Sequence, residues 1–184
     1  MTEQLATKQF SIEFATEADV SSIGRVHLQS MFETYPNREA GIDKGWIKQK
    51  LGFLIGSDSD EFRRRTVRQA ETDPDHVLYL VVKNIRGQVV GFFHVSRNEQ
   101  QAKLEAIYLT EEARGTGVGS QLIQRGLEFA GKLPMSLEVL DYNQRAIRLY
   151  EKYGFDEVPD SHKIIRDKLP VFTMQRNPAK ETKS

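Results

Sequence analysis

The sequence predicts a single α+β domain, and three observations support this fold class. Before residue 77, apolar residues recur mostly at helical spacing, after one short strand. From residue 77 the period changes to that of strands, with a hairpin turn at Gly87. A length of 184 residues suits one domain with a sizeable core, and neither an internal repeat nor an interdomain linker is visible.

The first half is expected to form one strand and two or three helices. Residues 10–14 alternate between apolar and polar side chains, as a half-buried strand does. Thr16 is a typical N-cap residue for a helix over residues 20–34. A second helix is expected over residues 44–54, and a further short helix within the polar residues 57–76.

The second half is expected to consist mostly of strands, with two helices between them. Asn143 is a typical N-cap residue and Gly154 a typical left-handed C-cap, so they bound the second of these helices. The first helix is expected at residues 116–130, and the strands at residues 77–83, 88–96, 103–109, 136–140, 155–158 and 171–175.

Composition excludes several classes of function. Lysine plus arginine and aspartate plus glutamate number 26 each, so no net charge attracts nucleic acid or an anionic membrane. The absence of cysteine excludes disulfides and thiolate nucleophiles, and the dispersed histidines lack the spacing of metal ligands. Neither a signal-like segment nor an apolar run of membrane length is visible. We therefore expect a cytoplasmic protein without metal, nucleic-acid partner or membrane contact.

A glycine-rich turn after residues 103–109 carries the strongest functional signal. Gly115, Gly117 and Gly119 let the backbone turn tightly and approach a ligand. The first N–H groups of the next helix lack intrahelical partners, so they form an anion site suited to a pyrophosphate. A P-loop would need lysine after Gly119, and a dinucleotide fingerprint would need glycine at position 120, where the chain has Ser120. Glycines can also gather in a strand-to-helix turn without a ligand.

Two motifs resemble those of the GNAT superfamily of N-acetyltransferases. The first, which resembles the acetyl-CoA signature of that family, is Arg114-x-x-Gly117-x-Gly119. The second is Asn143-x-x-Ala146-x-x-x-Tyr150, followed by Gly154 and Phe155. The resemblance implies a single-domain GNAT fold over residues 10–176, with a mixed, mostly antiparallel central sheet flanked by helices on both faces. Residues 1–9 would then be an N-terminal extension and residues 177–184 a disordered tail.

The resemblance also implies which residues bind coenzyme A. The glycine-rich turn would wrap the diphosphate, and the preceding strand would offer backbone groups to the pantetheine arm. The implied cofactor-binding residues are Ile107, Tyr108, Leu109, Arg114, Gly115, Thr116, Gly117, Val118, Gly119, Ser120, Asn143, Ala146 and Tyr150.

Two residues are candidates for catalysis. The resemblance gives Tyr150 the role of general acid, because a phenol beside the thioester can protonate the departing thiolate. Taken alone, Tyr150 would be interpreted as a core aromatic residue. Glu105 is the candidate base, because it is the carboxylate inside the cofactor strand, and alternation places it on the face of Ile107 and Leu109. The alternative for Glu105 is a solvated residue or a partner of a nearby arginine.

The resulting hypothesis is an acetyl-CoA-dependent N-acetyltransferase that transfers the acetyl group directly to a primary amine of a small molecule, polyamine or peptide. Direct transfer is expected because no cysteine can carry an acetyl-enzyme intermediate. The alternative is a coenzyme A-binding sensor or interaction module without transferase activity. Homodimers are common in the family, so the resemblance also suggests a homodimer.

Two groups in the first helices bear on the acceptor. Phe32, Tyr35 and Trp46 are expected to form a small satellite core between these helices. An acidic lining for a cationic acceptor would come from Glu33, Glu39 and Asp43, which could equally be ordinary solvated charges.

Overall fold

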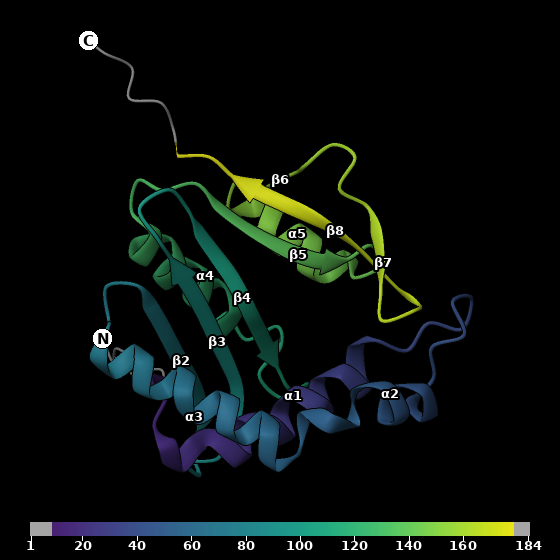
Figure 1. Ribbon diagram of the computed structural model, residues 1–184, viewed down its shortest axis with the longest axis horizontal. Coiled ribbons are helices and arrows are strands. Elements are labelled where there is room, and N and C mark those ends of the chain that lie inside the picture. Colours follow the sequence, from purple (N-terminus) through teal and green to yellow (C-terminus); the bar gives the residue numbers. More distant parts are fainter. Residues whose placement is uncertain (1–8, 179–184) are drawn as a thin grey trace, which may run out of the picture.

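An eight-stranded sheet forms the centre of the structure, a computed structural model that describes residues 9–178 (Figure 1). Its order is β1-β2-β3-β4-β5-β8-β6, with β7 also paired to β8, and every neighbouring pair is antiparallel except β4 with β5. The strands are β1 (Phe10–Phe14), β2 (Val77–Asn84), β3 (Val89–Arg97), β4 (Ala102–Leu109), β5 (Met135–Leu140), β6 (Asp156–Glu157), β7 (Lys163–Ile165) and β8 (Leu169–Arg176).

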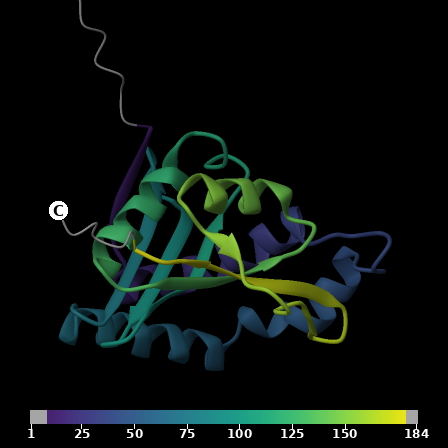
Figure 2. The same ribbon diagram turned by 90° about the horizontal axis from the view of Figure 1, so that it is seen from above.

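Helices cover both faces of this sheet, as the fold class predicted (Figure 2). Helices α4 and α5 pack on one face, and α1 and α3 pack on the other, with α2 beside α1. The helices are α1 (Val20–Thr34), α2 (Lys44–Leu51), α3 (Ser57–Thr72), α4 (Val118–Ala130) and α5 (Gln144–Lys152). Short 3₁₀ turns at Glu17–Asp19 and Gly52–Leu54 precede α1 and follow α2.

Strand β2 shows why the sheet is covered on both sides. Leu80 and Val82 belong to the apolar cluster under α4 and α5, whereas Tyr79 and Val81 belong to the cluster under α1 and α3. Because successive side chains of a strand point to opposite faces, a strand that is apolar over residues 77–82 needs a layer of helices on each side.

Two predicted elements differ from the structure, and one strand was not predicted. The polar segment after residue 56 forms the 16-residue helix α3 rather than a short one. Its buried face includes Arg63 and Thr66 beside Val67, so the apolar periodicity that reveals a helix was weak. The strand expected at residues 155–158 is only Asp156–Glu157. Strand β7 was not predicted, because no glycine marks the turn that joins it to β8.

That turn between β7 and β8 bends through two non-glycine residues, Arg166 and Asp167, in the left-handed region. Contacts to residues from the first half of the chain hold it in place. Lys50 Nζ of α2 lies 2.9 Å from an Asp167 carboxylate oxygen, and Lys168 Nζ donates to the carbonyl of Gly41 at 3.1 Å. The last strands are therefore attached to the segment between α1 and α2.

The predicted terminal segments, residues 1–9 and 177–184, lie almost entirely outside the described residues. None of the helices between residues 9 and 178 combines the length and the apolarity that crossing a membrane requires.

His27 gives the fold a dependence on pH. It lies on α1 with its ring 4.2 Å from the Tyr108 ring and 5.3 Å from the Phe92 ring, measured between centroids. Burial, with a smaller contribution from the positive charge of Arg63, lowers the pKa of His27 to about 3. The imidazole is therefore neutral in the folded chain at pH values where an unfolded histidine becomes protonated.

We predict that the free energy of unfolding falls as the pH drops below about 6.5, since the unfolded chain then binds a proton that folded His27 does not. Between pH 7 and pH 5 the free energy of unfolding of the wild type should fall by about 2 kcal/mol more than that of the variant His27→Met, which cannot be protonated at this position. Urea denaturation of both proteins at the two pH values measures this difference. Equal losses would contradict a neutral buried His27.

Candidate functional site

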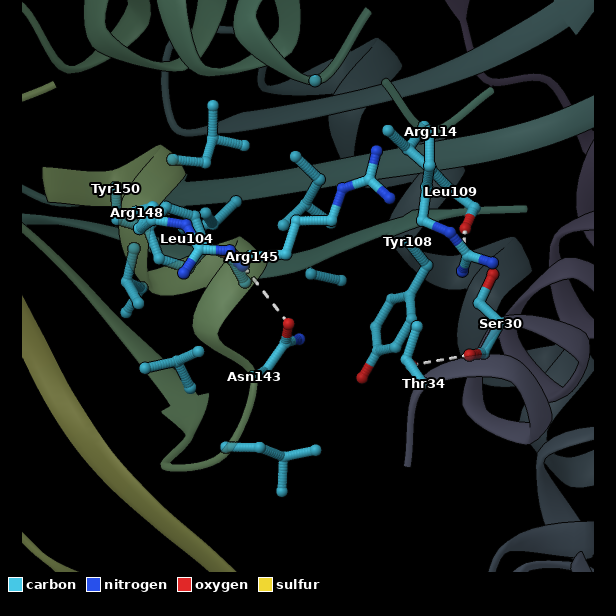
Figure 3. A pocket seen from close by; sticks show the side chains of 18 of the residues that line it. Ser30, Thr34, Leu104, Tyr108, Leu109, Arg114, Asn143, Arg145, Arg148 and Tyr150 are labelled. Atoms are coloured by element: carbon cyan, nitrogen blue, oxygen red, sulfur yellow. Dashed lines mark hydrogen bonds between the residues drawn. The ribbon is translucent and has the colours of Figure 1, made fainter. Parts of the chain in front are cut away.

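A cavity of about 540 Å³ lies where β4 and β5 separate (Figure 3). These parallel strands pair over three residues, and the last pair is Leu104 with Leu137. Beyond that pair the strands diverge, as Figure 1 shows. Side chains and backbone from β4, β5, the start of α4, α5 and the end of α1 line the space between them. The volume is in the range of sites that enclose small molecules and cofactors.

A β-bulge in β4 lies directly after its last pair with β5. His94 of β3 pairs with Ala106, but the next residue, Val95, pairs with Leu104. Glu105 is therefore an extra residue in β4, and the alternation of side chains is interrupted there.

The bulge makes one expectation about Glu105 wrong. Leu104 and Ile107 both pack toward α4 and α5 although they are three residues apart. Glu105 points to the opposite face, where its carboxylate accepts a hydrogen bond from Ser96 Oγ at 2.8 Å and lies 2.9 Å from Lys103 Nζ. Glu105 still lines the cavity, so its role as the base stays a prediction.

The glycine-rich loop leaves a series of main-chain N–H groups free at the cavity. Gly115 and Gly117 have φ values of 81° and 91°, which favour glycine, and Gly117 is the N-cap of α4. Within residues 9–178, no protein group accepts a hydrogen bond from the N–H groups of residues 115–120. Gln121 is the first to donate, to the carbonyl of Gly117 at 3.1 Å. Consecutive free donors at a helix N-terminus are groups that are able to hold an anion.

The side chain of Arg114, by contrast, is already engaged by protein groups. Its Nη2 atom donates to Glu33 Oε2 at 2.6 Å, and its Nη1 atom donates to the carbonyl of Leu109 at 3.1 Å. Its main-chain N–H donates to the carbonyls of Thr110 and Glu111. Glu33 is thus an ion-pair partner of Arg114 rather than a free acidic residue, and Asp43 caps α2 by accepting from the N–H of Trp46.

Helix α5 contributes two arginines that sequence reasoning did not single out. Arg145 extends toward the glycine-rich loop (Figure 3), and its Nη2 atom lies 3.0 Å from the position of a Cβ atom built at Gly115. Arg148 lines the cavity one turn further along. Neither guanidinium has a carboxylate partner in the described chain. The sequence did contain a signal for these arginines, because both follow closely after the predicted cap Asn143. The structure shows this cap: Asn143 Oδ1 accepts a hydrogen bond from the N–H of Ala146 at 3.2 Å.

Tyr150 lies on the buried side of α5 and also lines the cavity. Burial, with a smaller contribution from nearby Tyr108, raises the pKa of the Tyr150 hydroxyl well above its usual value. No described residue forms a hydrogen bond with this hydroxyl. Tyr150 therefore presents a neutral phenol whose O–H remains available to a ligand.

Helix α1 contributes Ser30 to the cavity, and the residue after it, Tyr35, lies against Tyr108 of β4; the sequence predicted neither placement. The hydroxyls of Tyr35 and Tyr108 lie 2.8 Å apart, and burial raises the pKa of both. Ser30 is only 2% exposed, and its Oγ finds no hydrogen-bond partner among the described groups. Phe32, Tyr35 and Trp46 pack against a third apolar cluster between α1, α2, β5 and β8, as expected of a satellite core.

Most of the residues predicted to bind a cofactor meet in this one cavity. Thr116 and Val118 are not among its lining residues, because the Thr116 hydroxyl donates to the carbonyl of Ala113 at 2.8 Å and Val118 is buried in the core. Those that line it are Ile107, Tyr108, Leu109, Arg114, Gly115, Gly117, Gly119, Ser120, Asn143, Ala146 and Tyr150.

Known proteins resemble this chain in sequence. It is 25% identical over 154 residues to the uncharacterized N-acetyltransferase MJ1207 of Methanocaldococcus jannaschii, an alignment that covers 75% of this chain and 60% of the relative. It is 33% identical over 82 residues to the peptidyl-lysine N-acetyltransferase YjaB of Escherichia coli, covering 45% of this chain and 51% of the relative. The chain thus matches little more than half the length of these relatives.

A solved structure resembles the fold. The crystal structure of the PaiA N-acetyltransferase from Thermoplasma acidophilum, in complex with coenzyme A, superposes with a TM-score of 0.74 at 18% identity. The match covers 91% of this chain and 98% of that one.

Residues 45–155, more than half of the chain, match the sequence model of the acetyltransferase (GNAT) family. This stretch contains both motifs and most of the residues that line the cavity. The chain belongs to the GNAT acetyltransferase family.

Proposed function

We propose that this protein is an acetyl-CoA-dependent N-acetyltransferase that moves the acetyl group directly to a primary amine. The observation that carries the proposal is that one cavity is lined by four loop residues with free N–H groups and by Tyr150 with its free hydroxyl; the four are Gly115, Gly117, Gly119 and Ser120. An anion site and a proton donor in the same cavity suit a ligand with a diphosphate at one end and a thioester at the other. The names of the relatives and the coenzyme A in the PaiA structure support this choice.

The residues present fit coenzyme A. The free N–H groups of the loop take the diphosphate, and Arg145 adds positive charge beside them. The backbone of residues 107–109, with Asn143 and Ala146, borders the part of the cavity that suits the pantetheine arm. When bound, acetyl-CoA supplies the activated acetyl group.

Proton transfers are divided between two residues of the chain. Tyr150 donates a proton to the sulfur as the carbon–sulfur bond breaks, and its raised pKa keeps that proton in place at neutral pH. Glu105 accepts a proton from the amine, directly or through water. This second transfer is needed because an alkyl amine with a pKa of about 10.4 is almost entirely protonated at pH 7.

The acceptor class is a primary amine of a small molecule, a polyamine or a peptide. The name of YjaB, a peptidyl-lysine N-acetyltransferase, supports the peptide member of this class. A coenzyme A-binding module without transfer remains the rival function. Binding of coenzyme A without transfer to any amine of a broad panel would favour that rival.

We predict that Gly117→Ala weakens coenzyme A binding at least about tenfold. The left-handed φ of 91° strains a residue with a Cβ by about 1–2 kcal/mol and so displaces the free N–H groups. Gly87→Ala is the matched control, since Gly87 also has a positive φ and open space around a built Cβ, but lies in the β2–β3 turn. Calorimetric titration with coenzyme A should show the wild-type affinity in Gly87→Ala and a weaker affinity in Gly117→Ala. Unchanged affinity of Gly117→Ala would argue against the loop as the diphosphate site.

We also predict that Tyr150→Phe lowers the transfer rate about a hundredfold, the low end of typical acid–base contributions, while coenzyme A still binds. Because the Tyr150 pKa is raised, the wild type should lose no activity through this group up to pH 10, the usual tyrosine pKa being about 10. Tyr153→Phe, at the C-cap of the same helix, is the control. A thiol-release assay measures both rates, and a variant as fast as wild type would remove Tyr150 from the mechanism.

For the base, we predict that Glu105→Gln lowers kcat/KM about a hundredfold at pH 7. The difference in kcat/KM between Glu105→Gln and the wild type should shrink as the pH approaches the amine pKa of about 10.4, because the acceptor then loses its proton without a base. Glu99→Gln in the β3–β4 turn controls for a general effect of charge. A deficit that stays constant with pH would assign Glu105 another role.

A further inference from the structure

Glu33, near the end of α1, connects that helix to the glycine-rich loop by two hydrogen bonds. Its Oε2 atom accepts from Arg114 Nη2 at 2.6 Å and from the main-chain N–H of Glu111 at 3.0 Å. Gln29, one turn earlier on α1, donates to the other carboxylate oxygen at 2.9 Å. The carboxylate is therefore held by its own helix and in turn holds a loop almost eighty residues away in the sequence.

Arg114 completes the connection from the other side. Besides Glu33, its guanidinium binds the carbonyl of Leu109, the last residue of β4. The Arg114 and Glu33 side chains are only 15% and 21% exposed, so this ion pair is screened less than one on the open surface. Three groups are thus held in place immediately before the free N–H groups begin: the Leu109 carbonyl, the Glu111 N–H and the Arg114 guanidinium.

Charge distribution separates the role of Arg114 from that of the other arginines at the cavity. The positive charge of Arg114 is offset by the Glu33 carboxylate in direct contact. Arg145 and Arg148 line the same cavity without a carboxylate partner among the described residues. An anion entering the cavity is attracted chiefly by these two, since the field of Arg114 is cancelled at short range by Glu33.

We propose that Glu33 is a positioning residue of the coenzyme A site: through Arg114 and the N–H of Glu111 it fixes the loop so that the free N–H groups are preorganised for the diphosphate. Arg114 then acts by holding the loop and not as a ligand of the phosphates. This inference rests on the proposed coenzyme A site. It makes α1, whose Ser30 and Thr34 line the cavity next to Glu33, part of the cofactor site.

A double-mutant cycle tests the proposal, with coenzyme A affinity measured by calorimetry. Glu33→Gln and Arg114→Gln should each weaken binding about tenfold. The double variant should bind no more weakly than either single one, because both remove the Glu33–Arg114 ion pair while a glutamine at position 33 can still accept from the Glu111 N–H. The kcat at saturating acetyl-CoA should stay within about twofold of wild type. Glu17→Gln, which breaks the 2.7 Å contact with Arg68 away from the cavity, is the matched control and should bind normally.

Opposite results would overturn the proposal. If Arg114 contacts the diphosphate, releasing it from Glu33 should leave coenzyme A affinity unchanged or increase it in Glu33→Gln, while Arg114→Gln alone weakens binding. A wild-type protein that binds no coenzyme A would instead defeat the proposed function itself, so the two failures are distinguishable.

The salt dependence of binding gives a second test that does not require Glu33→Gln to fold. Arg114→Gln should bind more weakly but keep the wild-type slope of log Kd against log salt concentration. Arg145→Gln should have a shallower slope, since it removes a charge that faces the anion directly. A shallower slope for Arg114→Gln would contradict a purely positioning role.

Discussion

The separation of β4 from β5 is the constraint on which the site depends. Three parallel pairs hold the strands together up to Leu104 and Leu137, and the bulge at Glu105 follows at once. A continuous ladder would have closed the sheet and filled the space with paired backbone. Because the ladder stops, β4 can offer backbone groups to a ligand. The loop after β4 leads into α4, which begins beside the opening. The cavity is thus a gap within the sheet rather than a hollow on its surface.

The polar groups around this gap differ in how far the protein already satisfies them. Arg114 and Glu33 satisfy one another, and Asn143 caps its helix. The loop N–H groups, the Tyr150 hydroxyl and the Ser30 hydroxyl lack protein partners among the described residues. The Ser30 hydroxyl is buried without a partner, which is costly, and it lies at the same cavity as the unpaired loop N–H groups and the Tyr150 hydroxyl, so this cavity is where a ligand is expected. The satisfied groups hold the backbone, and the unsatisfied ones are available for recognition.

Local signals in the sequence predicted the order of the elements well. Thr16 and Asp19 form the capping box before α1, and Asn143 and Gly117 mark the starts of α5 and α4. The features that the sequence did not reveal depend on distant contacts. The direction of Glu105 follows from how β4 pairs with β3, and the Glu33–Arg114 pair joins segments that come together only in the fold. For α3, a buried arginine replaced the apolar residues that periodicity requires.

The last strand has a consequence for how the chain reaches its working form during synthesis. Strand β8 pairs with β5 over six residues and lies between β5 and β6, and the turn before it is attached to α2. Until β8 emerges from the ribosome, β5 is an unpaired edge that carries the apolar residues Val139 and Leu140 next to the cavity. The nascent domain cannot bury that edge until β8 has been synthesised, so until then it is vulnerable to association with other chains.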